Sequence, residues 1–161
     1  MRTHHRTLLP ALFCVAVSLP LATRADDDGA RMPAQVPKAY TQECAGCHMA
    51  FPPGLLPAAS WRRMMNSLEQ HYGSDASLEP AVVKELSDWL QANAAQGRRA
   101  RADSAPPEDR ITRTRWFVRE HREIAPSVFR RQSIKSAANC MACHADAERG
   151  DFDDDGVRIP K

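Results

Sequence analysis

Two short stretches of the sequence combine cysteine and histidine at a spacing that suits cofactor attachment. The motif Cys-x-x-Cys-His occurs twice, as Cys44-Ala-Gly-Cys47-His48 and as Cys140-Met-Ala-Cys143-His144. This pattern is the attachment signature of c-type haem. Two cysteines three apart on one helical turn can both form thioethers on one side of a porphyrin, and the next residue can bring its imidazole to the iron. The sequence therefore predicts two covalently bound haem c groups.

Zinc binding and dithiol redox chemistry are the alternatives for these four cysteines. A single zinc ion held by four thiolates would leave both motif histidines unexplained. A thioredoxin-like dithiol is expected next to a strand-helix-strand pattern, which is not found here. Two unlinked dithiols would also risk wrong disulfides in an oxidising compartment. Haem attachment explains the cysteines and the histidines together, and we prefer it.

Two more histidines, His71 and His121, are candidates for the sixth position of each iron. His48 and His144 are the expected first ligands, and the remaining histidines of the chain lie in its first five residues. Two irons thus lack a ligand and two histidines are unassigned, which predicts bis-histidine ligation. Met64 and Met65 are rivals, because Met/His ligation is common in cytochromes c. We expect both methionines to pack against the haem instead.

The segments around these histidines have a helical pattern. We expect a helix over 60–74, with Ser60 as its N-cap, Gly73 as its stop and His71 on the apolar face. A second helix is expected to open at Glu79-Pro80 and to end before Gly97. Around His121, apolar residues recur at spacings of three and four.

A loop and a linker complete the expected layout. The proline-containing loop 51–57 follows the first motif, and one of its carbonyl groups could orient the ring of His48, although a simple turn explains the loop equally well. Residues 97–110 are charged and have no apolar period, which is typical of an interdomain linker.

The N-terminus has the features of a secretory signal. Arg2 and Arg6 precede an apolar run over 8–21, and a plausible cleavage site follows Ala25. The run is shorter than the ~20 residues of a spanning helix and contains two prolines, so a membrane anchor is the weaker alternative. We expect residues 1–25, including the fifth cysteine, Cys14, to be removed. The mature chain is then an exported protein without an integral membrane segment.

Composition bounds the class of protein. The chain has 161 residues, is 43% hydrophobic and 26% charged, and has a formal charge of +2, which becomes close to zero without the signal. Nothing in this balance favours a nucleic-acid partner. The expected fold is mostly α, with two small haem-binding lobes: an N-terminal haem c domain over 26–96 and a C-terminal one over 111–161.

Beyond the two motifs, nearly all of the expected mature chain resembles the bacterial dihaem cytochrome c family known as DHC. The stretches that carry the resemblance are ECAGCHMAFPPGLLPAASW, RITRTRWFVREHRE and SAANCMACHADAERGDF. It implies a small periplasmic electron carrier with an N-terminal lobe similar to a class I cytochrome c. It also implies His/His ligation, by His48 with His71 and by His144 with His121.

The resemblance also implies redox protein partners, among them a membrane b-type cytochrome or a small oxygen-binding cytochrome. The expected function is electron transfer without catalysis, because an iron with two strong protein ligands has no open position for a substrate. A dihaem peroxidase-like enzyme and a haem-based gas or redox sensor are the alternatives. Residue counting alone leaves open a crossed arrangement, in which His71 serves the iron of His144.

Overall fold

The structure is a computed structural model that describes residues 31–102 and 105–161, and in these ranges it is helical without a β-strand. Its α-helices in chain order are α1 (Lys38–Cys44), α2 (Ala58–Met65), α3 (Pro80–Ala92), α4 (Gly97–Ala102), α5 (Arg115–Glu120) and α6 (Pro126–Phe129). Single turns of 3-10 helix are η1 (Pro53–Leu55), η2 (Leu68–Gln70), η3 (Pro107–Asp109), η4 (Ile111–Arg113), η5 (Cys140–Ala142), η6 (Ala147–Arg149) and η7 (Asp154–Gly156). The expectation of a mostly α fold is confirmed.

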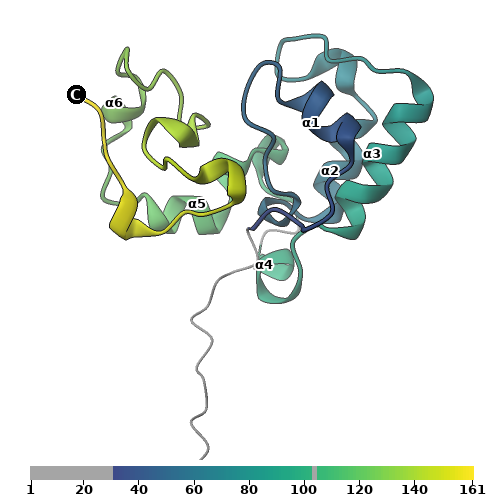
Figure 1. Cartoon of the computed structure of the whole chain (residues 1–161). Coiled ribbons are helices and arrows are strands. Elements are labelled where there is room, and N and C mark those ends of the chain that lie inside the picture. Colours follow the sequence, from purple (N-terminus) through teal and green to yellow (C-terminus); the bar gives the residue numbers. More distant parts are fainter. Residues whose placement is uncertain (1–30, 103–104) are drawn as a thin grey trace, which may run out of the picture.

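Helices α1, α2 and α3 gather on one side of the molecule around a packed core (Figure 1). The buried side chains of this core come from all three helices and the segments between and after them; they are Tyr40, Leu56, Trp61, Met65, Leu86, Leu90 and Ala94. Helix α3 is the longest helix of the described chain and supplies Leu86 and Leu90, one turn apart on its inner face. Apolar burial of this kind is the main stabilising term for a small helical unit.

Helix α3 forms largely as the sequence predicts. Glu79 is its N-cap and Pro80 its first residue, where a proline costs no hydrogen bond. The helix ends at Ala92, where Asn93 takes the C-cap position and donates its side-chain amide to the carbonyl of Trp89.

The predicted helix over 60–74 is wrong in its extent. Helix α2 begins at Ala58, so Ser60 lies inside it and Pro57 is the N-cap. The chain leaves the helix at Asn66, and Ser67 donates its hydroxyl to the carbonyl of Arg63. Side chains of these two types compete with the helical backbone for hydrogen bonds. A 3-10 turn, η2, follows.

Helices α5 and α6 and the C-terminal turns lie on the other side of the molecule (Figure 1). Thr114 is the N-cap of α5, and its hydroxyl accepts the backbone N–H of Phe117. Pro126 opens α6. Between the two sides, the charged segment 97–110 contains α4 and η3, so the segment that we expect to be a linker has helical turns of its own.

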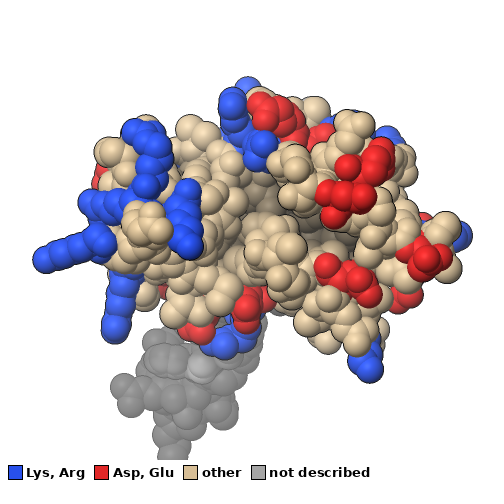
Figure 2. All heavy atoms as spheres, turned by 90° about the horizontal axis from the view of Figure 1, so that it is seen from above, with Lys and Arg blue, Asp and Glu red and all other residues tan. Residues whose placement is uncertain are grey.

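None of the helices in the described ranges is long and apolar enough to cross a bilayer. The expected signal segment 1–25 lies outside the described residues. Figure 2 shows an uneven charge distribution on one face: Lys and Arg gather over the half that contains α6, and Asp and Glu over the half that contains α3. Exposed basic residues after Arg115, the first residue of α5, are Arg119, Arg122, Arg130, Arg131, Lys135, Arg149, Arg158 and Lys161.

Candidate haem-binding sites

The first Cys-x-x-Cys-His motif lies at the end of α1. Cys44 is the last residue of the helix and is half-buried, and the chain turns at Ala45, whose N–H donates to the carbonyl of Thr41. Cys47 and His48 follow in the turn and are exposed. The two sulfur atoms and the imidazole therefore come from adjacent turns of one short segment.

The ring of His48 has a fixed tautomer. Its Nδ1 lies 2.7 Å from the carbonyl oxygen of Met49. A carbonyl oxygen only accepts, so Nδ1 carries the proton and Nε2 keeps the lone pair that binds a metal. The loop 51–57, which could have supplied this carbonyl, does not do so: Met49 lies before the loop, and the carbonyls of Phe51 and Pro53 accept from the Tyr40 hydroxyl at 2.6 Å and the Trp61 indole N–H at 2.8 Å.

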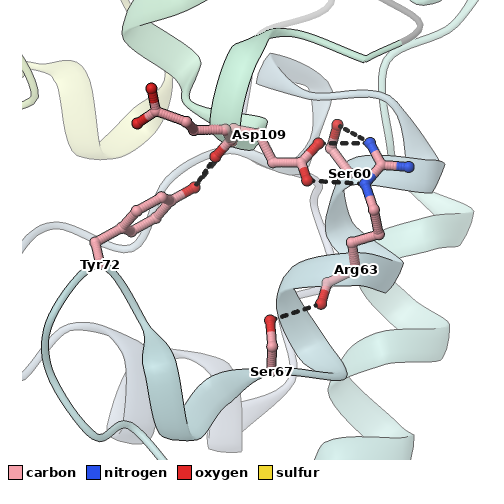
Figure 3. A network of polar contacts seen from close by, with 6 residues as sticks. Ser60, Arg63, Ser67, Tyr72 and Asp109 are labelled. Carbon is pink, nitrogen blue, oxygen red and sulfur yellow. Dashed lines mark hydrogen bonds and ion pairs between the residues drawn. The ribbon is translucent and has the colours of Figure 1, made fainter.

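His71 lies in the turn after η2 and not on a helix face. Its neighbour Tyr72 has a left-handed backbone (φ 51°). The Tyr72 hydroxyl lies 3.0 and 3.1 Å from the carbonyl oxygens of Glu108 and Asp109. Figure 3 shows how the segment 107–109 is held in turn by α2, since Arg63 reaches both carboxylate oxygens of Asp109 at 2.5 and 2.8 Å. A distant segment thus fixes the turn that carries His71.

The second motif forms the turn η5, and all four predicted residues of this site line one cavity. His121 is the C-cap of α5. The walls of the cavity are mostly apolar and aromatic; they are Leu55, Ile111, Trp116, Phe117, His121, Ile124, Val128, Phe129, Ile134, Ala137, Asn139, Cys140, Cys143, His144, Phe152, Val157 and Ile159. A flat apolar cofactor matches this lining.

The ring of His121 is held by one neighbour, Phe117. The two rings are stacked with centroids 4.0 Å apart and planes 17° apart, and Nδ1 of His121 lies 2.9 Å from the Phe117 carbonyl oxygen. Nε2 again keeps its lone pair. His121 follows Phe117 by four residues, and the contact between them combines stacked rings with a hydrogen bond to the backbone.

The four histidines form two facing pairs. Ring centroids of His48 and His71 are 6.1 Å apart, and those of His121 and His144 are 6.2 Å apart. With a metal–nitrogen bond of about 2.0 Å, and a ring nitrogen about 1.1 Å from its ring centre, two imidazoles on opposite sides of one metal ion have centroids about 6.2 Å apart. The buried Nδ1 of His71 has no hydrogen-bond partner in the described chain, so no protein group there satisfies this nitrogen. Both pairs fit an iron between the rings.

The pKa shifts of the motif cysteines and of two site histidines favour metal-ligand chemistry over a redox-active dithiol. Burial raises the pKa of Cys44 and of Cys140 to about 11, with a further contribution from Glu43 at the first. Reactive dithiols have lowered thiol pKa values. Burial, followed by the facing imidazole, lowers the pKa of His71 and of His144. Neutral imidazole is the form that binds metal.

Alternative ligands are not brought together. No group of three or more His, Cys, Asp or Glu side chains in residues 31–102 and 105–161 could hold a metal ion, so the four cysteines do not form a zinc site there. Met65 is buried in the core of α1, α2 and α3, and Met64 packs against this core.

Two contacts of the sites have no signal in the sequence. Leu55 follows the first motif in the chain, yet it lines the cavity of the second. Tyr72 follows His71, yet its hydroxyl bonds to carbonyl groups 36 and 37 residues away. Both contacts join segments whose proximity depends on the tertiary fold.

The chain is similar to known dihaem cytochromes. The family model described as dihaem cytochrome c matches residues 40–152. A dihaem cytochrome type c from Shewanella baltica OS155 is 38% identical, with 78% of this chain and 95% of that chain covered and a TM-score of 0.67. A structure of dihaem cytochrome c from Rhodobacter sphaeroides is also 38% identical, with 76% and 100% covered and a TM-score of 0.65. No curated protein matches the sequence.

Proposed function

The chain belongs to the dihaem cytochrome c family and carries two c-type haems, and on this premise we propose that it is an electron carrier with two histidines on each iron. The observation that carries the proposal is the pair of ring separations, 6.1 Å between His48 and His71 and 6.2 Å between His121 and His144. Ligation is then uncrossed, since each proximal histidine faces its own partner.

Each predicted residue has one role in this proposal. Cys44 and Cys47 form the thioethers of the first haem, and Cys140 and Cys143 those of the second. When bound, haem iron supplies one-electron redox chemistry. The paired imidazoles leave no coordination position for a substrate, and they favour the ferric state more than a thioether ligand does. The carrier is therefore expected to have lower reduction potentials than Met/His cytochromes.

We assign the two haems to two lobes joined by residues 97–110, with an N-terminal lobe, 26–96, similar to a class I cytochrome c and a C-terminal lobe over 111–161. Support comes from the packed core of α1, α2 and α3 and from the separate cavity behind α5. Leu55 is buried and lines that cavity, and Ile111 both lines it and packs against the first core. These two side chains join the second cavity to the N-terminal half by direct apolar contact.

We further assign the protein to the periplasm, after removal of residues 1–25, and to a chain of redox proteins. A membrane b-type cytochrome or a small oxygen-binding cytochrome fits as the partner. On the face shown in Figure 2, basic side chains gather over the half with α6 and acidic ones over the half with α3. This supports docking regions of opposite charge on that face, because charge complementarity steers the encounter of redox proteins.

Carbon monoxide binding tests the sealed coordination directly. The reduced two-haem protein is expected to show no change in its absorption spectrum under carbon monoxide. His71→Ala and His121→Ala, each of which removes one ligand, are expected to bind one equivalent. A wild-type protein that binds carbon monoxide, or that shows high-spin ferric iron and reduces peroxide, would instead be a sensor or a peroxidase-like enzyme.

A further inference from the structure

The two histidine pairs differ in the angle between their rings. The planes of His48 and His71 are 29° apart, and those of His121 and His144 are 74° apart, although the centroid separations of the two pairs are nearly equal. Building on the bis-histidine ligation proposed above, we propose that Phe117 is a positioning residue that holds His121 nearly perpendicular to His144 and thereby makes the two haems electronically different.

Phe117 restrains the ring of His121 in two ways. Its own ring lies face to face with the imidazole at 4.0 Å, and its carbonyl oxygen accepts the Nδ1 proton at 2.9 Å. Rotation of the imidazole about its Cβ–Cγ bond breaks the hydrogen bond and brings the ring edge into the face of Phe117. Both restraints therefore select one ring plane.

Phe117 is itself immobilised. It is buried, and its backbone N–H donates to the hydroxyl of Thr114, the N-cap of α5. On the other side of the site, Phe152 meets the ring of His144 edge-on, with centroids 5.6 Å apart and planes 75° apart. The 74° angle thus results from aromatic packing on both imidazoles.

The first site holds its rings differently. Phe51 and Tyr72 contact His48 and His71 at centroid distances of 5.0 Å, with planes 35° and 63° apart. The Nδ1 of His71 has no hydrogen-bond partner in the described chain. The ring of His71 therefore lacks the combination of a stacked aromatic neighbour and a hydrogen-bonded carbonyl that restrains His121.

The ring angle matters because each imidazole interacts with the iron d orbital perpendicular to its own plane. Parallel rings act on the same iron d orbital and separate its energy from that of the second such orbital. Perpendicular rings act on one orbital each and leave the energies of the two orbitals nearly equal. Low-spin ferric iron with separated orbitals gives a rhombic electron paramagnetic resonance signal, and iron with nearly equal orbitals gives a strongly anisotropic one. Orientation of axial ligands by neighbouring groups is one of the ways a protein tunes its haem.

Electron paramagnetic resonance of the oxidised two-haem protein in frozen solution tests the proposal. The wild type is expected to give two low-spin signals of equal intensity, one rhombic and one strongly anisotropic. Phe117→Leu removes the flat ring and is expected to abolish the anisotropic signal in favour of a rhombic one, with the other signal unchanged. Phe117→Tyr keeps the stacked ring and is expected to keep both signals.

Phe129→Leu is the matched control. Phe129 lines the same cavity but lies 6.0 Å from His121 with its ring tilted by 57°, so its loss tests for a general effect of an emptier cavity and is expected to leave the anisotropic signal in place. Where Phe117→Leu does not retain its haem, Phe117→Met removes the ring while keeping more side-chain volume.

The outcomes separate this proposal from the ligation on which it rests. Two rhombic signals in the wild type, or an anisotropic signal that survives Phe117→Leu, overturn the role of Phe117 while leaving bis-histidine ligation intact. A wild-type spectrum with high-spin iron or with the pattern of thioether ligation overturns the ligation itself.

Discussion

The two halves of the molecule surround similar cofactor sites with different amounts of protein. Before residue 96, three helices enclose a continuous apolar core made of protein side chains packed on one another. After residue 104, the buried apolar side chains of the described chain are only Pro106, Phe117, Ile134 and Ala147, and most of the other large apolar groups line the cavity. Small units of this size have marginal cores. The C-terminal half is therefore expected to depend more on its haem for stability.

Removing each pair of attachment cysteines would test this difference with the largest expected effect. Cys140→Ala with Cys143→Ala is expected to unfold the C-terminal half, because its cavity then has no apolar occupant. Cys44→Ala with Cys47→Ala is expected to leave much of α1, α2 and α3 protected. Hydrogen exchange read by mass spectrometry, with haem content as the control, measures both. Equal loss of protection in the two halves would contradict the comparison.

A substitution that creates a cavity in the N-terminal core tests the same comparison in the other half. Leu86 is fully buried in α3, and Leu86→Ala is expected to destabilise this half by about 2–5 kcal/mol. Urea unfolding of the two-haem protein, with exchange in each half as the readout, measures the effect. Val118→Ala, at a side chain that is 58% exposed, is the control and is expected to change the midpoint little. A similar loss of stability in Leu86→Ala and Val118→Ala would show that the N-terminal core contributes little to the stability of this half.

The cap of α5 gives the corresponding test in the C-terminal half. Thr114 is buried, accepts the N–H of Phe117 and donates its hydroxyl to the carbonyl of Ile111. Thr114→Ala is expected to cost about 1–2 kcal/mol, with the loss of exchange protection concentrated in α5. Thr114→Ser keeps the oxygen and is expected to retain most of the stability. An unchanged unfolding midpoint in the alanine variant would rule out this role.

The smallest effect is expected at the ion pair between the halves. The hydrogen bonds and charge of Arg63 hold the pKa of Asp109 below its ordinary value, so this pair stabilises the fold above the ordinary carboxyl pKa of about 4, and the contribution is lost as the pH falls through and below it. Both side chains are partly exposed, and Asp109→Asn is expected to cost about 0.2–1 kcal/mol at neutral pH.

Urea unfolding at neutral pH and near pH 3 measures this loss. The difference between wild type and Asp109→Asn is expected to shrink at the lower pH, because the wild-type carboxyl also loses its charge there. Lys84 and Asp88 form an exposed pair within α3, and Asp88→Asn is the matched control. A difference that grows towards low pH would contradict the sign of the effect.

Much of the site was predictable because its spacing is local. The attachment motifs place their cysteines and histidine within one turn of the backbone, and α3 follows from an apolar period and a proline in its first turn. The helix through His71 was wrong because Asn66 and Ser67 end α2 early, and hydrogen bonds of such residues compete with helical propensity. The turn that carries His71 depends on Tyr72 and the carbonyl groups of residues 108 and 109, which no local pattern indicates.

The sequence by itself determined that the chain binds two cofactors, and it limited the candidates for their attachment and ligation to four cysteines and four histidines. Only the tertiary structure decided which histidines lie next to each other, at what angle their rings lie, and that Leu55 reaches the second cavity. The reason is physical: attachment needs atoms a few bonds apart along the chain, whereas the plane of an imidazole is set by side chains packed against it from segments far apart in the sequence.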